Sequence, residues 1–529
     1  MDHQEKNPEA DSDQADGIKK DINNDAQSSV EPDGDCDSPF NRRDFLRTIA
    51  VAGAGLWLPQ SVLAAQKAAK GTSAQGASAQ GMKTQSDKAK ADAKSTPNQT
   101  REAVKKEIRE AVKPAAKAPK PEARLNVAIV GAGSQGRNLL LNALKIPGIN
   151  FVAVCDIWPY SQRYATNIIS KYNEIRKIKT APRGYSDYQE MLAQEKDLDA
   201  VIIATPDWMH APITVACLQA GKHVYCEKEM SNTLEGARSM VEAQRATGKL
   251  LQIGHQRRSN PRYWHAYELI HKEGVLGRMT HTYGQWNRPK RLEQGWPKNE
   301  AMSDEALKKH GYDTMERFRN WRWYKQYSGG AIADLGSHQV DIFSWFMRSN
   351  PVAIMASGSN DYYKKGEWYD HVMAIYEYQT EKGKVRGFYQ VLNTTGWGGY
   401  YEVFMGDEGV LEVSEDVKKG YLVREPGAKP KVWEDDAAKV ERMGMSAIPL
   451  LVGETLNPAG RPKEQKLAAM SEKPPHQLHL ENFFSAIRHN TKLSCPPEIG
   501  YETAVAVLKA NDAVAAEKRL EFTPNEFKV

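Results

Sequence analysis

The amino-acid sequence predicts an α/β fold with two parts: an N-terminal doubly wound parallel sheet, and a C-terminal α/β domain with a large, open, mostly antiparallel sheet. From Ala123 onward, short apolar runs alternate with helical patterns, which is typical of successive βαβ units. After about residue 255, apolar and polar residues alternate over longer stretches, as in strands with one exposed face. We therefore expect one domain over 123–254 and a second over 255–529, whose C-terminal helices could pack back on the first.

The first domain is expected to open with a buried strand, a glycine turn and a helix. The apolar run Val127–Val130 leads directly into Gly131-Ala132-Gly133-Ser134-Gln135-Gly136, and residues 138–144 have a helical pattern. In this order, backbone N–H groups and the positive end of the helix can meet a pyrophosphate, as in a Rossmann domain. The predicted pyrophosphate contacts are Gly131, Gly133, Ser134, Gln135 and Gly136.

Asp156 ends the next apolar run, Phe151–Cys155, twenty residues after Gly136. An acidic side chain here would accept a hydrogen bond from the ribose 2′-hydroxyl of NAD and would repel the 2′-phosphate of NADP. We therefore expect NAD as the cofactor, with NADP the weaker candidate. The alternative is a structural role, in which Asp156 caps the following helix.

The rest of the first domain continues the alternation of strands and helices. The expected elements are a helix over 159–173, a helix opened by a capping box at 187–190, strands over 200–204, 222–226 and 249–253, and a helix over 233–247. Ligands of such sheets bind beyond the carboxyl ends of the strands. The residues after these ends that we predict to bind the cofactor are Thr205, Pro206, His210, Glu227 and Lys228. For His210, a structural role at the start of a helix is an equal alternative.

The second domain is expected to combine longer strands with three helices. The strands are predicted over 279–286, 373–378, 385–391, 401–405 and 409–413, and the helices around 262–273, 478–489 and 501–518.

The first 122 residues are expected to lie outside both domains. Residues 1–40 are acidic and polar and are expected to be disordered, and residues 66–122 are an Ala/Lys/Pro-rich linker. Between them, 41–65 combine the twin arginines Arg42 and Arg43 with a short apolar run and small residues, which is typical of a twin-arginine export signal. The alternative is an accidental arginine pair beside a core helix. We therefore expect recognition by the twin-arginine export machinery and a periplasmic or otherwise exported protein.

The composition excludes several other kinds of site. The net charge is only +5 over 529 residues, and no aromatic residues are interleaved in the Lys-rich linker, so we expect no nucleic-acid partner. The five cysteines contain no CxxC pair, and His476 with His479 has no third ligand nearby in the sequence. We therefore expect no metal site.

Four motifs occur in a characteristic order: the glycine sequence at 131–136, Thr205-Pro206, Glu227-Lys228, and 329–338 with Asp334 and His338. Together they resemble the Gfo/Idh/MocA family, which includes glucose–fructose oxidoreductase and inositol dehydrogenase. The resemblance covers about 123–529. It implies an NAD-dependent oxidoreductase in which Lys228, Asp334 and His338 are catalytic, and it implies a dimer or tetramer formed through the open sheet.

The three residues suit the oxidation of a secondary alcohol. A neutral imidazole at His338 can take the hydroxyl proton, the Lys228 ammonium can stabilise the developing alkoxide, and the Asp334 carboxylate can orient either the imidazole or a substrate hydroxyl. Taken singly, Lys228 is more simply a surface ion-pair partner and His338 a packed histidine. The sequence departs from the family at Glu229, where a proline is usual, so we expect an ordinary peptide bond there. This departure makes His338 the better candidate for the proton acceptor.

The second domain contains nine of the twelve tryptophans, which suits stacking on sugar rings. Core packing is the more frequent role for any single one of them. The weaker substrate candidates are Arg257, Arg258, Tyr283, Trp321, Trp323, Tyr324 and His371.

We therefore expect an exported enzyme that oxidises a secondary hydroxyl of a sugar, glycoside or polyol. Because free NAD is scarce outside the cytoplasm, the cofactor is expected to be tightly bound and recycled on the enzyme. One alternative is an NAD-dependent glycoside hydrolase or lyase that works by transient oxidation and elimination, with Glu229 or Tyr324 as an extra acid–base group. A third hypothesis is a non-enzymatic NAD-binding protein.

Overall fold

The computed structural model describes residues 122–290, 293–435, 437–450 and 473–529. The predicted acidic leader, the export signal and nearly all of the predicted linker lie outside the described residues.

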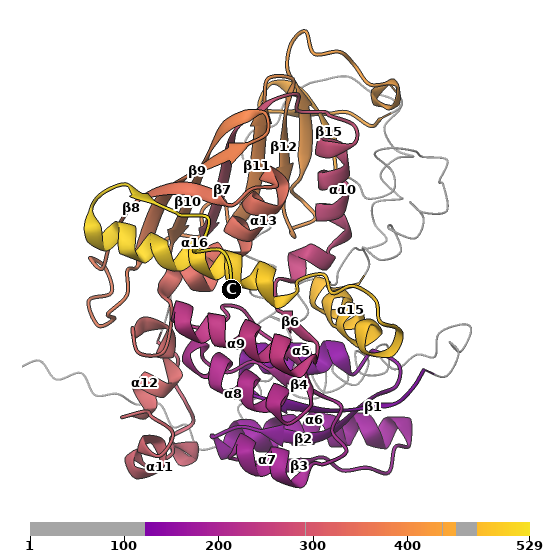
Figure 1. Ribbon diagram of the computed structural model, residues 1–529, viewed down its shortest axis with the longest axis vertical. Helices are drawn as coiled ribbons and strands as arrows, with labels where there is room; N and C mark the ends of the chain where they lie inside the picture. The colour runs from indigo at the N-terminus through magenta and orange to yellow at the C-terminus, as the bar shows by residue number, and fades with distance from the viewer. Residues whose placement is uncertain (1–121, 291–292, 436, 451–472) are drawn as a thin grey trace, which may run out of the picture. The chain divides into compact units, whose positions relative to one another are not determined.

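Within the described ranges, six parallel strands form the first sheet, in the order β3-β2-β1-β4-β5-β6 (Figure 1). The strands are β1 (Leu125–Val130), β2 (Ile149–Cys155), β3 (Arg183–Tyr185), β4 (Ala200–Ile203), β5 (His223–Cys226) and β6 (Leu251–Ile253). The helices between them are α5 (Ser134–Ala143), α6 (Pro159–Arg176), α7 (Tyr188–Gln194), α8 (Asp207–Gln219) and α9 (Leu234–Thr247). This doubly wound parallel sheet confirms the predicted fold class. Its strand order reverses between β1 and β4, where ligands of such sheets bind.

The start of α7 shows how local sequence sets an element. Asp187 is its N-cap, and the Asp187 carboxylate accepts a hydrogen bond from the Gln189 N–H at 2.7 Å. A side-chain acceptor at this position satisfies a backbone donor that has no partner within the helix. The predicted helix start at this position is therefore confirmed.

The second sheet contains ten strands in the described part of the chain, and each neighbouring pair is antiparallel except β7 with β10. The order is β14-β15-β13-β12-β11-β7-β10-β9-β8-β16. The central strands are β7 (Met279–Asn287), β8 (Pro351–Ser359), β9 (His371–Thr380), β10 (Gly383–Leu392), β11 (Tyr400–Gly406) and β12 (Gly409–Val413). The shorter strands are β13 (Tyr421–Arg424), β14 (Val440–Arg442), β15 (Met445–Pro449) and β16 (Leu520–Glu521). The predicted open, mostly antiparallel sheet is confirmed.

Helix α13 (Ser337–Met347) packs closely on the inner face of this sheet because two glycines face it. A Cβ atom at Gly284 of β7 would lie 2.8 Å from the Phe343 ring, and one at Gly387 of β10 would lie 3.2 Å from it. Larger side chains would push the helix away from the sheet. This close packing sets the distance between the sheet and the residues that begin α13.

The remaining helices of the second domain include α10 (Pro261–His271), α11 (Asp304–Lys308), α12 (Met315–Arg319), α15 (Pro475–His489) and α16 (Pro497–Ala516). Shorter helical turns are η2 (Gln256–Ser259), η3 (Lys298–Glu300), η4 (Trp321–Trp323), η5 (Ile332–Gly336) and η6 (Val432–Glu434). Helix α15 contacts α5, and α16 contacts α9. The Arg238 guanidinium of α9 donates a hydrogen bond to the Tyr501 hydroxyl of α16 at 2.8 Å.

Several elements of the second domain were not predicted from the sequence. Asp334 lies in the π-helical turn η5, and α13 starts at Ser337, just before His338. Strand β8 was not predicted because its small residues, Ala353, Ala356 and Gly358 among them, give a weak alternation. The short strands β3 and β13 to β16 carry too few residues for a clear pattern.

Candidate active site

The glycine turn after β1 leaves a cradle at the N-terminus of α5. Gly131 has φ +87°, and a Cβ atom there would lie 2.6 Å from the Ala204 carbonyl oxygen. A Cβ atom at Gly136 would overlap the Gly131 carbonyl oxygen, whereas one at Gly133 would enter open space. The first turn of α5, at Ser134, has no side-chain cap. Its N–H groups are therefore directed at the space where a pyrophosphate binds in this fold.

Asp156 is bound to the backbone of the same turn. Its carboxylate accepts hydrogen bonds from the Ala132 N–H at 2.7 Å and from the Trp158 N–H at 2.8 Å. Burial raises the pKa of Asp156, and these two N–H groups oppose that shift. Asp156 thus lies beside the glycine turn, as predicted, and also makes the contact at the start of the following helix that the structural alternative requires. Its role toward the ribose stays a prediction.

The loops after β4 and β5 meet the glycine turn from the other side. The Gln135 side-chain amide donates to the Glu227 carboxylate at 3.1 Å, which joins the turn to the loop after β5. The Thr205 hydroxyl, next to Pro206, is buried and has no hydrogen-bond partner among the described residues. It is therefore available to a ligand.

His210 does not face this cradle. The imidazole is buried, and its two ring nitrogens lie 2.6 Å from the Glu229 carbonyl oxygen and 2.9 Å from the Thr205 carbonyl oxygen. It therefore braces the loop after β4 against the loop after β5, which favours the structural alternative over the predicted contact with the cofactor.

Lys228 and Asp334 meet between the two domains. The Lys228 ammonium donates to the Asp334 backbone carbonyl and lies 3.4 Å from the Asp334 carboxylate. Two arginines approach the same carboxylate, Arg322 at 3.1 Å and Arg288 at 3.7 Å. Three cations around one carboxylate hold Asp334 in place.

His338 lies one turn beyond Asp334. It is 7% exposed, and its ring centroid lies 5.5 Å from that of Trp286 on β7. Burial, with Lys228 as the next cause, keeps the pKa of His338 well below its ordinary value. The imidazole is therefore neutral at neutral pH and can accept a proton.

The Lys228–Glu229 peptide bond is cis, which differs from the ordinary bond expected after Lys228. The Glu229 side chain is fully buried, and its carboxylate accepts a hydrogen bond from the Met230 N–H at 2.8 Å. Its other oxygen, Oε2, has no hydrogen-bond partner among the residues described. Burial raises the pKa of Glu229 to about 8.

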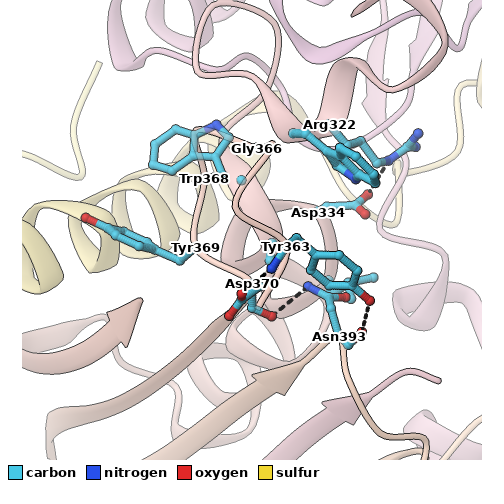
Figure 2. Close-up of a pocket in the computed structure, with 12 residues that line it drawn as sticks. Arg322, Asp334, Tyr363, Gly366, Trp368, Tyr369, Asp370 and Asn393 are labelled. Atoms are coloured by element: carbon cyan, nitrogen blue, oxygen red, sulfur yellow. Dashed lines mark hydrogen bonds and ion pairs between the residues drawn. The ribbon is translucent and has the colours of Figure 1, made fainter. Parts of the chain in front are cut away.

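A cavity opens beside Asp334 (Figure 2). Aromatic side chains from several segments line it, and Arg322, Asp334 and Asn393 add polar groups. The aromatic residues are Trp323, Tyr363, Trp368 and Tyr369. In Figure 2 the labelled side chains surround the pocket, with Trp368 and Tyr369 at the left, Arg322 and Asp334 at the right, and Asn393 below. Apolar faces with a few polar groups are typical of a site for a small polar ligand.

Residues 294–328, which we call the cap segment, pack on the loops at the carboxyl ends of β2 and β4. The Trp158 indole donates to the Glu300 carbonyl oxygen at 2.6 Å, and the Arg319 guanidinium lies 4.9 Å from the centre of the Trp158 ring. The Trp208 indole donates to the Tyr312 hydroxyl at 3.0 Å. The cap segment thus has its own apolar cluster against the first domain, made by Trp158, Leu307, Tyr312, Met315, Tyr324 and Tyr327.

Comparison with known proteins identifies this arrangement. Residues 125–255 match the profile of an oxidoreductase family with an NAD-binding Rossmann fold, and residues 263–412 match the GFO/IDH/MocA C-terminal domain. The chain belongs to the Gfo/Idh/MocA family of oxidoreductases. Its first domain is therefore an NAD-binding Rossmann domain, as predicted, and the two matches together span just over half of the chain.

Three similar proteins illustrate the range within this family. Inositol 2-dehydrogenase of Rubrobacter xylanophilus is 26% identical over 319 residues, which are 59% of this chain and 77% of the relative. A glycosyl hydrolase family 109 protein of Parabacteroides distasonis is 35% identical over 137 residues, which are 26% of this chain and 29% of the relative. The structure of levoglucosan dehydrogenase in complex with NADH and levoglucosan has the same fold, with a TM-score of 0.57 at 20% identity, covering 76% of this chain and 99% of that one. Overall, the chain spans from less than a third to about three quarters of the length of such curated relatives.

Several predicted substrate contacts of this Gfo/Idh/MocA protein have other partners. Arg257 is 1% exposed, and its guanidinium pairs with Glu402 and, at 3.1 Å, with Glu415. Arg258 pairs with Asp341 at 2.7 Å. Both arginines are therefore held in buried ion pairs, which corrects their prediction as substrate contacts.

Three aromatic or imidazole predictions also need correction. Tyr283 stacks on Phe388 on the outer face of the second sheet, because its neighbours on β7 face α13 and side chains alternate along a strand. Tyr324 is 6% exposed in the cluster of the cap segment, where the Arg317 guanidinium lies 4.0 Å from its ring centre. The His371 imidazole contacts the Asp370 carboxylate and the Ser359 hydroxyl and is not among the residues that line the cavity.

Trp323 is the one predicted substrate residue that lines the cavity directly, and Trp321 lies 4.1 Å below the Arg322 guanidinium. The sequence did not predict Arg288, Arg322 or the cavity residues around Tyr363. For Tyr363 and Trp368 a usable signal was present, because residues 362–369 are unusually rich in aromatic side chains.

No group of three or more potential metal ligands is found among the residues that the structure describes. Within the same ranges, no helix has the length and apolar character needed to cross a membrane.

Proposed function

We propose that this protein is an exported, NAD-dependent dehydrogenase that oxidises a secondary hydroxyl of a sugar, a glycoside or a polyol and keeps its NAD bound between turnovers. The observation that carries the proposal is the meeting of Lys228, Asp334 and neutral His338 beside an aromatic cavity and next to the Rossmann cradle. The names of the relatives, inositol 2-dehydrogenase and levoglucosan dehydrogenase, support a sugar or polyol as the substrate.

The residues of the cradle fit NAD. The uncapped start of α5, the open space at Gly133 and the buried, unpartnered Thr205 hydroxyl are suited to phosphate and ribose oxygens. When bound, NAD supplies the hydride acceptor for the oxidation. Gly131, Ser134, Gln135 and Asp156 would complete its binding site.

The chain's own groups provide the proton chemistry. His338 accepts the proton of the substrate hydroxyl, and the Lys228 ammonium stabilises the oxygen as negative charge develops on it. Asp334 holds Lys228 through its backbone carbonyl and its carboxylate. A positioned base of this kind contributes about 10²- to 10⁴-fold to a rate.

The aromatic walls of the cavity support a carbohydrate as the substrate. Apolar C–H faces of a sugar ring can stack on Trp323 and Trp368, while its hydroxyl groups can bond to Arg322 and Asn393. Gly330 makes this wall possible, because a Cβ atom there would lie 2.8 Å from the Trp368 ring.

The cap segment supports tight retention of NAD, since it packs on Trp158 and Trp208 beside the edge where a dinucleotide binds. Export through the twin-arginine machinery rests on residues 41–65 of the sequence alone. A folded protein that leaves the cytoplasm with its cofactor would need this retention.

The test is to purify the exported protein, measure its bound NAD, and follow NADH formation with a panel of free sugars, glycosides and polyols. We expect NAD to co-purify, and His338→Ala to lose at least 100-fold in the rate of NADH formation while it retains NAD. The proposal would be refuted if the purified protein contained no NAD and also bound none when NAD was added. An unchanged rate in His338→Ala would refute the proposed base.

A second candidate is an NAD-dependent glycoside hydrolase or lyase, favoured by the similarity to the glycosyl hydrolase family 109 protein. In this reaction, oxidation to a ketone would acidify the neighbouring C–H, and elimination of the aglycone would leave a double bond conjugated to the ketone. A hydrolase would then add water to this double bond, whereas a lyase would not, and the ketone would be reduced again. Release of the aglycone without net NADH formation would identify it.

We also propose a homo-oligomer formed through the outer face of the second sheet. Met355, Met373 and Ile375 of β8 and β9 are exposed there at 47%, 41% and 38%. Exposed apolar side chains that are grouped in this way favour an interface between subunits. Light scattering of the parent and of Met373→Glu tests this, with a smaller particle expected for the variant and an equal one contradicting it.

A further inference from the structure

Behind His338 lies a second buried histidine, His255, which the mechanism above does not use. His255 follows β6 and is 1% exposed. Neither of its ring nitrogens has a hydrogen-bond partner among the described residues. A buried imidazole always carries at least one N–H group, and leaving that donor without an acceptor is unfavourable.

His338 has the same deficiency. Its Nδ1 atom is enclosed and has no hydrogen-bond partner in the described ranges. The two ring centroids lie 6.3 Å apart, and the ring planes stand edge-on at 80° to one another. A small rotation of either side chain, or one bridging water molecule, can join ring nitrogens at this centroid distance.

The far side of His255 leads to a fixed carboxylate. Its Nδ1 atom lies 3.9 Å from Oδ2 of Asp341 on α13. Asp341 is immobilised by Arg258, whose Nε lies 2.8 Å from Oδ1 and 3.0 Å from Oδ2, and by the Thr503 hydroxyl at 3.3 Å. The order His338, His255, Asp341 is that of a base, its orienting group and a terminal acceptor.

The tautomer of His338 decides whether it can act as the base. A neutral imidazole accepts a proton only at the nitrogen that carries none, and the other nitrogen must then be the donor. For Nε2 to accept the substrate proton, Nδ1 must carry hydrogen and needs an acceptor. Asp334 is held by Lys228, Arg288 and Arg322, so that acceptor must come from elsewhere.

We propose that His255 is a positioning residue that keeps Nε2 of His338 free to take the substrate proton. His255 accepts a hydrogen bond from Nδ1 of His338 and donates one from its own Nδ1 to Asp341, directly or through one water molecule. The proposal rests on the proposed dehydrogenase function. No proton leaves the chain in this arrangement. The proton taken at Nε2 makes His338 an imidazolium, whose charge the chain of hydrogen bonds to Asp341 stabilises.

The surroundings of His255 keep it neutral, as an acceptor must be. The charged and titratable groups that face it from the loop after β5, from η2, from α13 and from α15 are Lys228, Arg257, Arg258, His338, Asp341 and His479. Burial is the main cause that lowers the pKa of His255 to about 4, and the cations add to it against the opposing effect of Asp341.

The first test uses the parent protein and needs no substrate. With histidine labelled by ¹⁵N, two-bond N–H correlation spectra of the protein purified with its NAD identify which nitrogen of His338 carries hydrogen, and His338→Ala assigns the signal. We expect the Nδ1–H form. A predominant Nε2–H form would overturn the proposal, whether or not any sugar is oxidised.

The second test compares three variants. His255→Phe removes both nitrogens but keeps a ring. It should lower kcat at least about tenfold, as part of the 10²- to 10⁴-fold that a positioned base contributes, with KM and bound NAD unchanged. It should also shift the acid limb of the pH–rate profile to lower pH, because the imidazolium of His338 loses its stabilisation. His255→Gln, which can accept and donate, should recover part of the rate.

His265→Phe is the matched control, since His265 is another buried histidine with an unpartnered nitrogen but lies on α10. Its kcat should equal that of the parent. The proposal is overturned if His255→Phe keeps kcat within twofold, or if it lowers kcat and bound NAD in the same proportion. Absence of NADH formation with every sugar would instead refute the dehydrogenase function and leave the tautomer result standing.

Discussion

Glu229 should make the protein less stable as the pH rises, and Glu229→Gln should remove that dependence. The folded chain keeps a proton on Glu229 up to about pH 8, because its side chain is fully buried, whereas the unfolded chain loses the proton near the ordinary value of 4.5. Between these values the folded state binds more protons than the unfolded state, so the free energy of unfolding falls with rising pH.

The size of the effect follows from the width of this window. Each pH unit within it costs about 1.4 kcal/mol, so the penalty at pH 7.5 reaches about 4 kcal/mol relative to pH 4.5. Glutamine keeps a side-chain oxygen that can accept the Met230 N–H bond but cannot ionise. We therefore expect Glu229→Gln to gain stability over the parent, by a few kcal/mol more at pH 7.5 than at pH 5.

The assay is urea unfolding of both proteins at pH 5, 6.5 and 7.5 with NAD at the same saturation throughout. Glu235→Gln serves as the control, because Glu235 is exposed in the first turn of α9. The burial argument is refuted if the difference between Glu229→Gln and the parent changes by less than about 1 kcal/mol over this range.

Three further predictions concern the ion pairs, the cradle and the cap segment. Arg257→Met should lower the free energy of urea unfolding by about 3–5 kcal/mol, because it leaves Glu402 buried and unpaired, and KM should stay constant. Adding Glu402→Gln should restore most of the lost stability. A raised KM with parental stability would instead favour a substrate contact. Gly133→Val should weaken NAD binding at least tenfold in a fluorescence titration. It should not lower the melting temperature of the NAD-free protein, because only open space surrounds that Cβ position. Equal NAD affinity would argue against the cradle. Trp158→Leu removes a hydrogen bond to Glu300 and a contact with Arg319, which together contribute roughly 1–2 kcal/mol. NAD should therefore dissociate about tenfold faster in a chase experiment. An unchanged dissociation rate would contradict retention of NAD by the cap segment.

The sequence predicted best what is determined locally. The glycine turn at 131–136 requires positive φ at Gly131 and a missing side chain at Gly136, and both needs are visible in the order of residues. The alternation along β7 and β10 likewise indicated strands with one buried face. The family resemblance then brought together Lys228 and Asp334, which no local pattern connects.

The incorrect predictions depend on partners far away in the chain. Arg257 and Arg258 follow the first domain and resemble ligand-binding residues, but Glu402 and Asp341 neutralise them from 145 and 83 residues away. Tyr283 was misplaced because one residue of strand register decides which face a side chain takes. Neither fact can be read from the neighbouring residues.

The geometry also explains why the active site needs both domains. Lys228 belongs to the loop after β5, whereas Asp334 lies in η5 and His338 at the start of α13, the helix that packs on the second sheet. Their meeting depends on contacts that hold one domain on the other, and the Asp207 carboxylate makes one of them by accepting the Gly329 N–H at 3.1 Å. Because Gly329 and Gly330 lead directly into η5, this hydrogen bond helps to set the position of Asp334 relative to Lys228. The position of the Asp334 carboxylate is thus set from the first domain as well as from the sheet beneath it.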